Sequence, residues 1–375
     1  MLNHQSGCIM VKLTGVLLAA AFVTLFFYFS TTDKARLNRH EAEYLWRVGL
    51  FTNSASNLVL NNNHLLYTFD FATEEIFDLN QETREMLGLY ALSYIYLETK
   101  DVKTGSRVKI VLNNLHRKLK LAPNGKYYIS YDLPKSRLGA EAMGLAAVLY
   151  FEKAAHKDNY KDLREKLKEG LLACFADKKG FLFNPLSDYT WPYFDGESWY
   201  ALAIYADMFP EDKSVADIIG KIDDTLMNVY QNRIDAGFTH WGMQAAAQRY
   251  LTTHDKKFLD FMWNIFLLYE QQEPYINAAG CAYLEALGDM AKAFNAAGEN
   301  NKYNRIVDRF NLEKNTPFIL QVTTKHLANG KKVAKTREKF IGLFLPDVNE
   351  SQTTVDVMGH CAVAVLKNKA QYLSK

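Results

Sequence analysis

The feature that most constrains this chain is a helix-rich segment that recurs every 56 residues. Three glutamates mark it: Glu85 in ETREMLGLYALSYIYLE, Glu141 in LGAEAMGLAAVLYFE and Glu197 in FDGESWYALAIYAD. Gly88 and Gly144 stand in the same register. A fixed period of this size is typical of folds in which one small structural unit is repeated. The chain is therefore expected to repeat such a unit, and the helices after the third copy to continue it.

Each copy is preceded by a short segment of alternating polar and apolar residues, over 64–70, 125–131 and 180–183. Alternation of this kind predicts a short β-strand. Each unit then consists of a β-like loop, an apolar helix and a more amphipathic helix. We expect helices over 36–51, 80–97, 102–119, 139–156, 160–174, 196–208, 213–230, 239–251, 256–269, 276–294, 300–310 and 355–372. Residues 316–326 fit a helix or a strand, and 331–349 read as a loop.

Half of these helices are apolar on nearly all sides, which is typical of helices buried in a large protein. They begin at Glu85, Glu141, Gly196, His240, Ala279 and Asp356. Their partners carry the charge. Six buried helices paired with six amphipathic ones predict an all-α fold, an (α/α)6 toroid with an inner and an outer ring and short β excursions at its mouth. A linear solenoid is the competing arrangement.

Composition limits the function. The 375 residues are 49% hydrophobic and 23% charged, and the net charge of +2 argues against a dedicated nucleic-acid binder. Cys8, Cys174, Cys281 and Cys361 form no motif, so we expect buried free thiols rather than a disulfide framework or a zinc site. We expect no metal and no cofactor.

The N-terminal region predicts a membrane anchor. Residues 13–30 form an uncharged apolar run of about the length that spans a bilayer, and Phe27-Tyr28-Phe29 is a poor signal-peptidase site. We expect a cytoplasmic tail over 1–12, a single-pass anchor in a bacterial inner membrane over 13–30, and one toroid domain over 31–375 in the periplasm.

The alternating helices, the Gly-Glu-Ser sequence at 196–198 and the closing segment VDVMGH at 355–360 resemble the six-hairpin (α/α)6-toroid superfamily. That superfamily includes glycoside hydrolases, polysaccharide lyases and the catalytic domain of glucuronyl C5-epimerases. The resemblance covers most of residues 36–372. It implies a closed ring and a protein that acts on a polysaccharide or oligosaccharide.

In such a ring the loops before the inner helices meet at one mouth, so acids, histidines and aromatic residues at these positions are the candidate site. Asp70, Glu85, Asp188 and Asn277 occupy such positions too. For catalysis we select Asp195, Glu197, His240, Asp356 and His360, and for substrate binding Trp191, Tyr193, Trp241, Arg137 and Glu141. Asp356 and His360 are four residues apart, so one helical face could hold an acid that orients an imidazole. A purely structural interpretation stays open, because carboxylates are stabilised at helix N-termini without any catalytic purpose.

Two classes of function remain. The first is an enzyme that cleaves a glycan with two carboxylates, or a lyase or epimerase that removes a proton beside a uronic carboxylate, with Arg137 neutralising the substrate. The second is a non-catalytic toroid that binds a glycan or a protein partner in a polysaccharide assembly or export machine of the cell envelope.

Overall fold

A computed structural model describes residues 39–77, 82–130 and 132–373. Of these described residues, those within 48–369 form one compact unit, and 39–47 with 370–373 belong to a second. Of the second unit, the described part comprises helical residues 39–47 and the end of the short helix α14 (Lys369–Leu373), and the rings of Tyr44 and Tyr372 lie 5.9 Å apart. The expected single domain over 31–375 stays a prediction.

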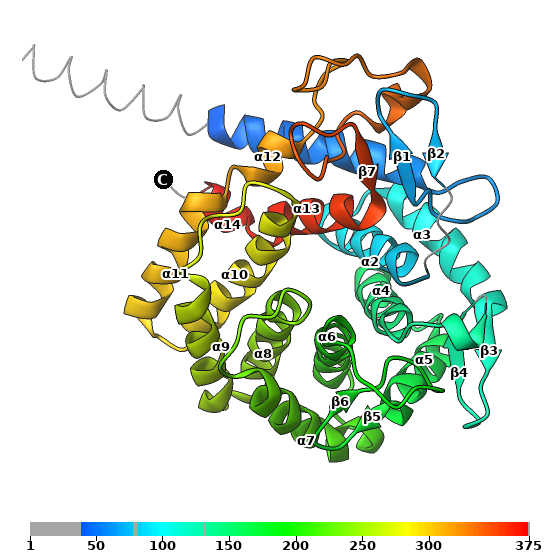
Figure 1. Cartoon of the computed structure of the whole chain (residues 1–375), viewed down its shortest axis with the longest axis vertical. Coiled ribbons are helices and arrows are strands. Elements are labelled where there is room, and N and C mark those ends of the chain that lie inside the picture. Colours follow the sequence, from blue (N-terminus) through cyan, green and yellow to red (C-terminus); the bar gives the residue numbers. More distant parts are fainter. Residues whose placement is uncertain (1–38, 78–81, 131, 374–375) are drawn as a thin grey trace, which may run out of the picture. The chain divides into compact units, whose positions relative to one another are not determined.

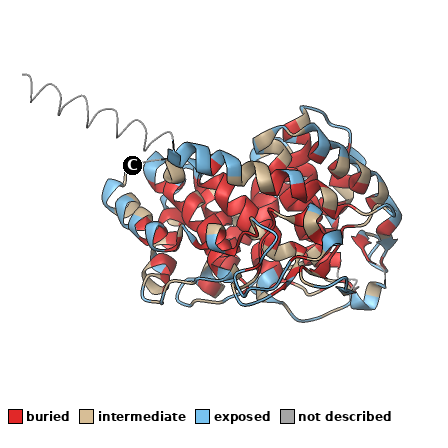
Figure 2. Cartoon of the chain, turned by 90° about the horizontal axis from the view of Figure 1, so that it is seen from above, coloured by how far each residue is buried: buried red, intermediate tan, exposed pale blue. Residues whose placement is uncertain are grey.

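The larger unit is built around six inner helices. Each contacts the next along the chain, and the last contacts the first, so the ring is closed (Figure 1). They are α2 (Glu82–Thr99), α4 (Gly139–Ala155), α6 (Pro192–Met208), α8 (Thr239–Thr253), α10 (Ala278–Ala296) and α13 (Val355–Lys367). Most of their residues are buried (Figure 2), as expected for helices that are apolar on all sides. The toroid prediction is confirmed, and the linear solenoid is excluded.

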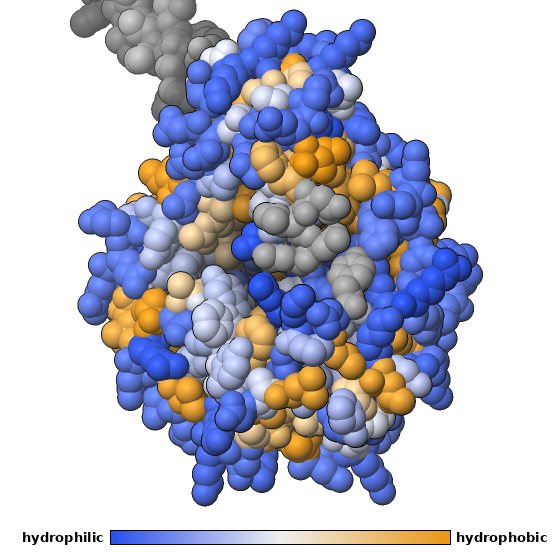
Figure 3. Space-filling view, turned by 45° about the vertical axis from the view of Figure 1, so that its right-hand side comes forward, coloured by the Kyte–Doolittle hydropathy of each residue, from blue (hydrophilic) through white to orange (hydrophobic). Residues whose placement is uncertain are grey.

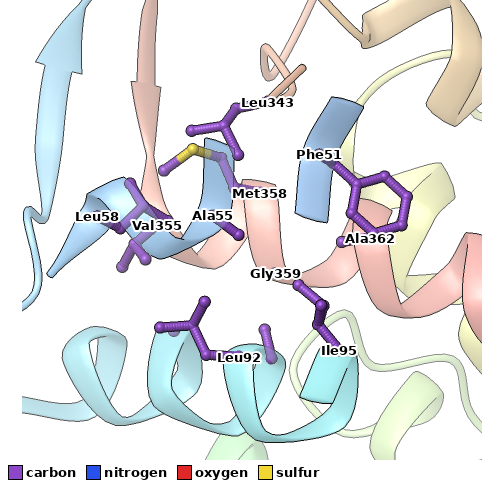
Figure 4. A pocket seen from close by; sticks show the side chains of 12 residues that line it. Phe51, Ala55, Leu58, Leu92, Ile95, Leu343, Val355, Met358, Gly359 and Ala362 are labelled. Carbon is purple, nitrogen blue, oxygen red and sulfur yellow. The ribbon is translucent and has the colours of Figure 1, made fainter. Parts of the chain in front are cut away.

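Five outer helices each pack on the inner helix that precedes them. They are α3 (Val102–Leu115), α5 (Lys161–Ala173), α7 (Lys213–Tyr230), α9 (Lys256–Tyr269) and α11 (Asn300–Glu313). The sixth outer position belongs to helical residues 48–55, which continue as the 3-10 turn η1 (Ser56–Leu58). Around a small cavity of about 10 Å³, Phe51, Ala55 and Leu58 face α2 and α13 (Figure 4). Its apolar walls make it a dry packing gap where the ring closes.

Short strands accompany the ring, as the alternating segments predicted. They are β1 (Thr68–Asp70), β2 (Ile76–Phe77), β3 (Leu119–Leu121), β4 (Tyr127–Ile129), β5 (Phe175–Ala176), β6 (Gly180–Phe181) and β7 (Gln352–Thr354). Strands β3 and β4 form one antiparallel hairpin, and β5 and β6 form another. The third sheet has the order β2-β1-β7, and Thr68 pairs with Thr354. This sheet joins the two ends of the ring, so backbone hydrogen bonds reinforce the closure between α13 and α2.

The remaining elements refine the sequence boundaries. Residues 316–326 contain the helix α12 (Thr316–Leu320), and the expected loop over 331–349 contains a 3-10 turn, η4 (Lys335–Phe340). Two further 3-10 turns are η2 (His116–Lys118) and η3 (Leu133–Lys135). The single helix expected over 355–372 is divided at Asn368 into α13 and α14.

The expectation that a helix starts at Gly196 is wrong. Helix α6 begins at Pro192, whose fixed φ and missing N–H suit the first turn of a helix, so Gly196 lies inside it. A Cβ at Gly196 would lie 2.6 Å from the Cβ of Trp241. Glycine is needed here because α6 and α8 approach each other closely, and not because the chain bends.

The expectation of free thiols is also wrong for two of the cysteines. Cys281 on α10 and Cys361 on α13 form a disulfide, while Cys174 is free and buried. The 80 residues that separate the pair concealed it, because only the ring brings these two helices side by side.

The predicted membrane helix over 13–30 lies outside the described residues. Within the described ranges, none of the helices has the length and apolar character needed to cross a bilayer.

Candidate active site

A cleft with a volume of about 710 Å³ opens where the inner helices begin. Residues from the first turn of every inner helix, or from the loop just before it, line the cleft. Of the ten predicted site residues, eight line it: Arg137, Trp191, Tyr193, Glu197, His240, Trp241, Asp356 and His360. The expectation that loops before the inner helices meet at one mouth is therefore correct.

Glu197 is a buried acid that lines the cleft. Its side chain is 2% exposed, and its Oε2 atom has no hydrogen-bond partner in the described part of the chain. Burial, and then the nearby charge of Asp356, raises the pKa of Glu197 to about 8. At neutral pH this carboxyl is therefore mostly protonated, and it can donate a proton to a bound group. A Cβ at Gly139 would lie 2.2 Å from Glu197 Oε2, so the glycine at the start of α4 makes room for this acid.

The equivalent acids in the earlier repeats have a structural role, because each accepts a hydrogen bond that holds its β-like loop against its inner helix. Glu85 accepts a hydrogen bond from the backbone N–H of Leu65 (3.3 Å), and Lys118 Nζ lies 2.7 Å from its other oxygen. Glu141 accepts from the backbone N–H of Ile129 at 2.5 Å.

In the third repeat this fastening role passes to Asp195. Its carboxylate accepts from the backbone N–H of Phe181 (2.5 Å) and from the Tyr230 hydroxyl (2.6 Å), and the side chain is fully buried. Burial raises the pKa of Asp195 to about 7, although these two hydrogen bonds act to lower it. Asp195 therefore takes the place of Glu197 in binding the loop.

Asp195 and Glu141 are accordingly absent from the cleft lining. Both had been selected from the sequence, Asp195 for catalysis and Glu141 for substrate binding. The structure corrects their expected position, because backbone N–H groups of β6 and β4 hold these carboxylates behind the cleft wall.

Asp356 supplies the second carboxyl group of the cleft. Arg84 Nε lies 3.6 Å from Asp356 Oδ2, and Arg84 Nη1 also donates to the Tyr67 hydroxyl (2.6 Å). Asp356 Oδ1 has no hydrogen-bond partner in the described residues. The cleft thus holds a buried acid with a raised pKa, Glu197, and a second carboxyl group that lies beside a guanidinium group.

His360 has a different partner from the one that sequence spacing suggested. Its Nδ1 lies 2.6 Å from Oε1 of Glu285, a fully buried acid on α10 that also accepts from the Tyr90 hydroxyl (3.3 Å). Asp356, four residues before His360, pairs with Arg84 instead. The Glu285 carboxylate fixes the orientation of the imidazole and leaves Nε2 as the nitrogen that can exchange a proton. Sequence reasoning missed Glu285, which lies in the middle of an apolar helix.

His240 lies beside this pair, with 5.5 Å between the His240 and His360 ring centroids. Burial, and then the neighbouring His360, lowers the pKa of His240 well below its usual value. His240 is therefore neutral at physiological pH. Its Nε2 atom is buried and has no hydrogen-bond partner in the described ranges.

A buried polar network lies behind the histidines, in the middle of the ring. Lys367 Nζ lies 2.6 Å from Asp289 Oδ2 and 3.0 Å from the Tyr200 hydroxyl, and it lies 4.0 Å from Glu285 Oε2. The Tyr200 hydroxyl in turn lies 2.6 Å from that of Tyr150. Lys367 thus connects Glu285 with Asp289 and the two tyrosine hydroxyls, and these contacts help to hold Glu285 in place beside His360.

Aromatic rings form the walls of the cleft. Trp191 and Tyr193 are 47% and 43% exposed, and they lie at the start of α6. Tyr275 and Tyr283, which also line the cleft, stack almost parallel, with ring centroids 5.4 Å apart. Trp241 is fully buried and contacts the His360 ring at 5.4 Å, so it supports the histidine more than it faces the open cleft. Flat, partly exposed rings are suited to contact the apolar faces of sugars.

Two of the other residues considered from the sequence have structural contacts. Asp70 accepts from the backbone N–H groups of Ala72 and Thr73, and Asn277 caps α10 by accepting from Ala279. Neither residue lines the cleft, and neither does Asp188. Among the described residues no group of three His, Cys, Asp or Glu side chains is placed to hold a metal ion.

No protein-family model matches the sequence, and no curated protein matches it either. Solved structures do match. An α-1,6-mannanase of glycoside hydrolase family 76 from Salegentibacter sp., in complex with α-1,6-mannotetrose, is 14% identical with a TM-score of 0.64, over 88% of this chain and 99% of the other. A family 76 mannosidase from Bacteroides thetaiotaomicron is 12% identical with a TM-score of 0.63, over 88% and 98%. An unsaturated glucuronyl hydrolase specific for heparin is 12% identical with a TM-score of 0.60, over 88% and 98%.

The ring is the six-hairpin (α/α)6 toroid. These matches cover almost the whole length of the other chains at low identity, so they establish the fold. The resemblance to the six-hairpin (α/α)6 toroid that was stated from the sequence is therefore confirmed for the fold.

Proposed function

We propose that the chain is an enzyme that hydrolyses glycosidic bonds, with Glu197 as the proton donor and Asp356 as the second carboxyl group. The observation that carries this proposal is the contrast between the two acids of one cleft. Glu197 is buried and protonated, and Asp356 stands beside the Arg84 guanidinium. Glycoside hydrolases use such a pair, in which one carboxylic acid protonates the leaving oxygen and the other activates water or attacks the sugar.

The substrate we propose is an acidic glycan. Two arginine side chains, Arg84 and Arg137, line the cleft together with the acids Glu197 and Asp356, and burial keeps Glu197 mostly protonated at neutral pH. The guanidinium group binds carboxylates well, since its donors match the two carboxylate oxygens. The carboxylate of a uronic acid unit would bind to these guanidinium groups, and the exposed rings of Trp191 and Tyr193 would contact the faces of the sugar.

The consecutive aspartates whose replacement inactivates the mannanase have no counterpart in the cleft lining of this chain. The inactive variant of that enzyme replaces two consecutive aspartates. The only consecutive aspartates here are Asp223 and Asp224, on the outer helix α7. Asp223 is bound to Arg249 (2.9 Å) and to the indole N–H of Trp199 (2.7 Å), away from the cleft.

A second candidate reaction has its own support in the pair formed by Glu285 and His360. An imidazole oriented by a buried carboxylate can act as a base, and removal of the proton beside a uronic carboxylate would give lyase or C5-epimerase chemistry. The 2.6 Å contact to Glu285 favours this role for His360. A non-catalytic toroid that binds a glycan within an envelope assembly is the remaining alternative.

One experiment separates these functions. The purified protein is incubated in deuterated buffer with oligogalacturonate, with α-1,6-manno-oligosaccharide and with a neutral gluco-oligosaccharide. New reducing ends without deuterium at C5 support hydrolysis. An unsaturated product, or deuterium at C5 without cleavage, supports lyase or epimerase chemistry. Binding without any product in the wild type contradicts the enzyme proposal and supports the binding protein.

Location at the cell envelope is proposed from residues 13–30 alone. We propose that this segment anchors the chain in a bacterial inner membrane with its toroid in the periplasm. Reporters that are active only in the periplasm or only in the cytoplasm, fused after Lys375, test it. Activity of the cytoplasmic reporter would overturn the orientation.

A further inference from the structure

A second hollow, with a volume of about 300 Å³, lies beside the first turn of α2. We call it the basic pocket. Its lining consists of Asn62, Asn63, His64, Asn114, Arg117, Lys118, Lys120 and Ser130. None of these eight residues is acidic, and none of them lines the cleft described above.

The charge of the basic pocket is only partly balanced. Glu85 lies 2.7 Å from Lys118 Nζ and 3.4 Å from His64 Nδ1, so one carboxylate neutralises the buried lysine. Arg117 and Lys120 are exposed, and neither forms an ion pair with a described residue. These two cations give the pocket a surplus of positive charge.

The pocket also offers neutral hydrogen-bonding groups. Three asparagine side chains line it, from Asn62, Asn63 and Asn114. Ser130 is 1% exposed, and its hydroxyl has no hydrogen-bond partner in the part of the chain that the structure describes. A buried hydroxyl without a partner destabilises the folded chain, so a ligand that forms a hydrogen bond with it would bind more tightly. Amide and hydroxyl groups next to cations are suited to an anionic group on a hydroxylated molecule.

We propose that the basic pocket binds the acidic group of a glycan, either a carboxylate or a sulfate, on a sugar unit outside the catalytic cleft. A hollow of this volume is at the small end of ligand pockets and accommodates a single sugar unit better than a long oligosaccharide. The alternative interpretation is that these cations are ordinary solvated surface residues with no ligand. That interpretation would account for Lys120 alone, but it does not account for a concave site that combines two cations without ion pairs among the described residues, three amides and a buried hydroxyl.

The position of the pocket connects it with the cleft. Arg84 lines the cleft, while the next residue, Glu85, contacts His64 and Lys118 of the basic pocket. The first turn of α2 therefore separates the two hollows. A glycan bound in the cleft could place a later acidic unit in the basic pocket. This last step rests on the proposed function, whereas anion binding by the pocket does not.

The test compares two double variants that lose the same charge. Arg117→Ala/Lys120→Ala removes the unpaired cations, and both side chains are exposed, so the fold is expected to persist. The control is Lys178→Ala/Lys221→Ala. Those lysines line a third hollow that also contains Asp177 and Asp224, and Lys221 pairs with Asp177 at 3.1 Å.

Calorimetry would measure the binding of hexameric oligogalacturonate as the carboxylated probe, a sulfated dextran hexamer as the sulfated probe and maltohexaose as the neutral one. We expect the affinity for at least one acidic probe to fall by about tenfold or more in the pocket variant, since each lost charged hydrogen bond is of that size. The control variant should bind like the wild type. The probe whose affinity falls further identifies the preferred acidic group.

Equal losses in both variants, or no loss in the pocket variant, would overturn the inference. Turnover on the shortest oligosaccharide that the wild type cleaves should be unchanged in the pocket variant, because such a substrate occupies the cleft alone. If no glycan is cleaved but the pocket variant still loses binding, the proposed function fails and the pocket assignment stands.

Discussion

Replacement of Glu197 by glutamine should make the protein more stable at neutral pH and abolish most of its turnover. The two effects have one cause. Glu197 is almost fully buried, its Oε2 has no partner among the described residues, and its pKa is raised from the ordinary value of 4.5 to about 8. A neutral amide of the same shape avoids the penalty for charge but cannot donate the proton that cleavage needs.

The size of the stability effect follows from the two pKa values. Below pH 4.5 the carboxyl is protonated in the folded and the unfolded chain, and its contribution to stability is fully present. As the pH rises from 4.5 towards about 8, the unfolded chain loses the proton and the folded chain retains it, so stability falls. Each unit of pH in this window costs up to about 1.4 kcal/mol, which amounts to about 3 kcal/mol at pH 7. Glu197→Gln should recover up to that amount.

The assay combines denaturant unfolding at a series of pH values with turnover on any glycan that the wild type cleaves. Loss of a general acid should reduce turnover by about a hundredfold or more. The matched control is Glu141→Gln, which changes a buried acid at the same position of the preceding repeat. Burial raises the pKa of Glu141 well above its usual value, but this residue accepts a bond from Ile129 and does not line the cleft. The control should therefore lose some of its pH dependence of stability and keep its turnover.

Two results would refute this reasoning. If wild type and Glu197→Gln show parallel stability profiles between about pH 5 and about pH 8, the carboxyl is not held protonated by burial. If both glutamine variants lose turnover equally, the effect comes from disturbed packing around buried acids and not from the proton of Glu197.

Three further predictions concern other parts of the ring. Glu285→Gln should reduce turnover by about a hundredfold or more if His360 exchanges a proton during the reaction, and unchanged kinetics would mean that the pair is structural. A double change of Cys281 and Cys361 to serine should lower the free energy of unfolding by about 4–5 kcal/mol, because the bridge closes an 80-residue loop, and identical denaturant curves with and without the bridge would contradict this. Trp191→Ala should weaken glycan binding in calorimetry by about 0.5–1.5 kcal/mol, and an unchanged affinity would exclude stacking on this ring.

The ring itself could be predicted from the sequence because its cause is local and repeated. A helix such as Gly139–Ala155, apolar around its whole circumference, is stable only when other helices surround it, and six of them require a common centre. The position of the cleft followed from the same argument, since the loops before the inner helices meet at one end. The hydropathy of the surface agrees with a ring whose apolar residues are mostly buried. Hydrophilic residues cover most of the face in Figure 3, and apolar residues form separate small patches on it.

Contacts between distant helices could not be predicted in this way. Glu285 lies within the apolar sequence CAYLEALG, where nothing marks it as the partner of His360. The disulfide between Cys281 and Cys361 joins the same two helices and was missed for the same reason. Both pairs depend on α10 and α13 being neighbours, which is a property of the closed ring and not of either segment.

The repeat also made Glu85, Glu141 and Glu197 look equivalent, and the start of each helix explains why they are not. Glu141 is the third residue of α4, and it reaches a backbone N–H of the β-like loop. In α6 the helix begins earlier, at Pro192, so Glu197 is the sixth residue and Asp195 is the fourth. A difference of about three residues is most of a helical turn, so Asp195 now meets the loop N–H of Phe181. Glu197 is thereby freed from the loop at the position where Asp356 and the aromatic walls converge. The earlier start of α6, together with an aspartate at 195 where the preceding repeats have Gly139 and Thr83, thus turns a structural acid into a candidate catalytic one.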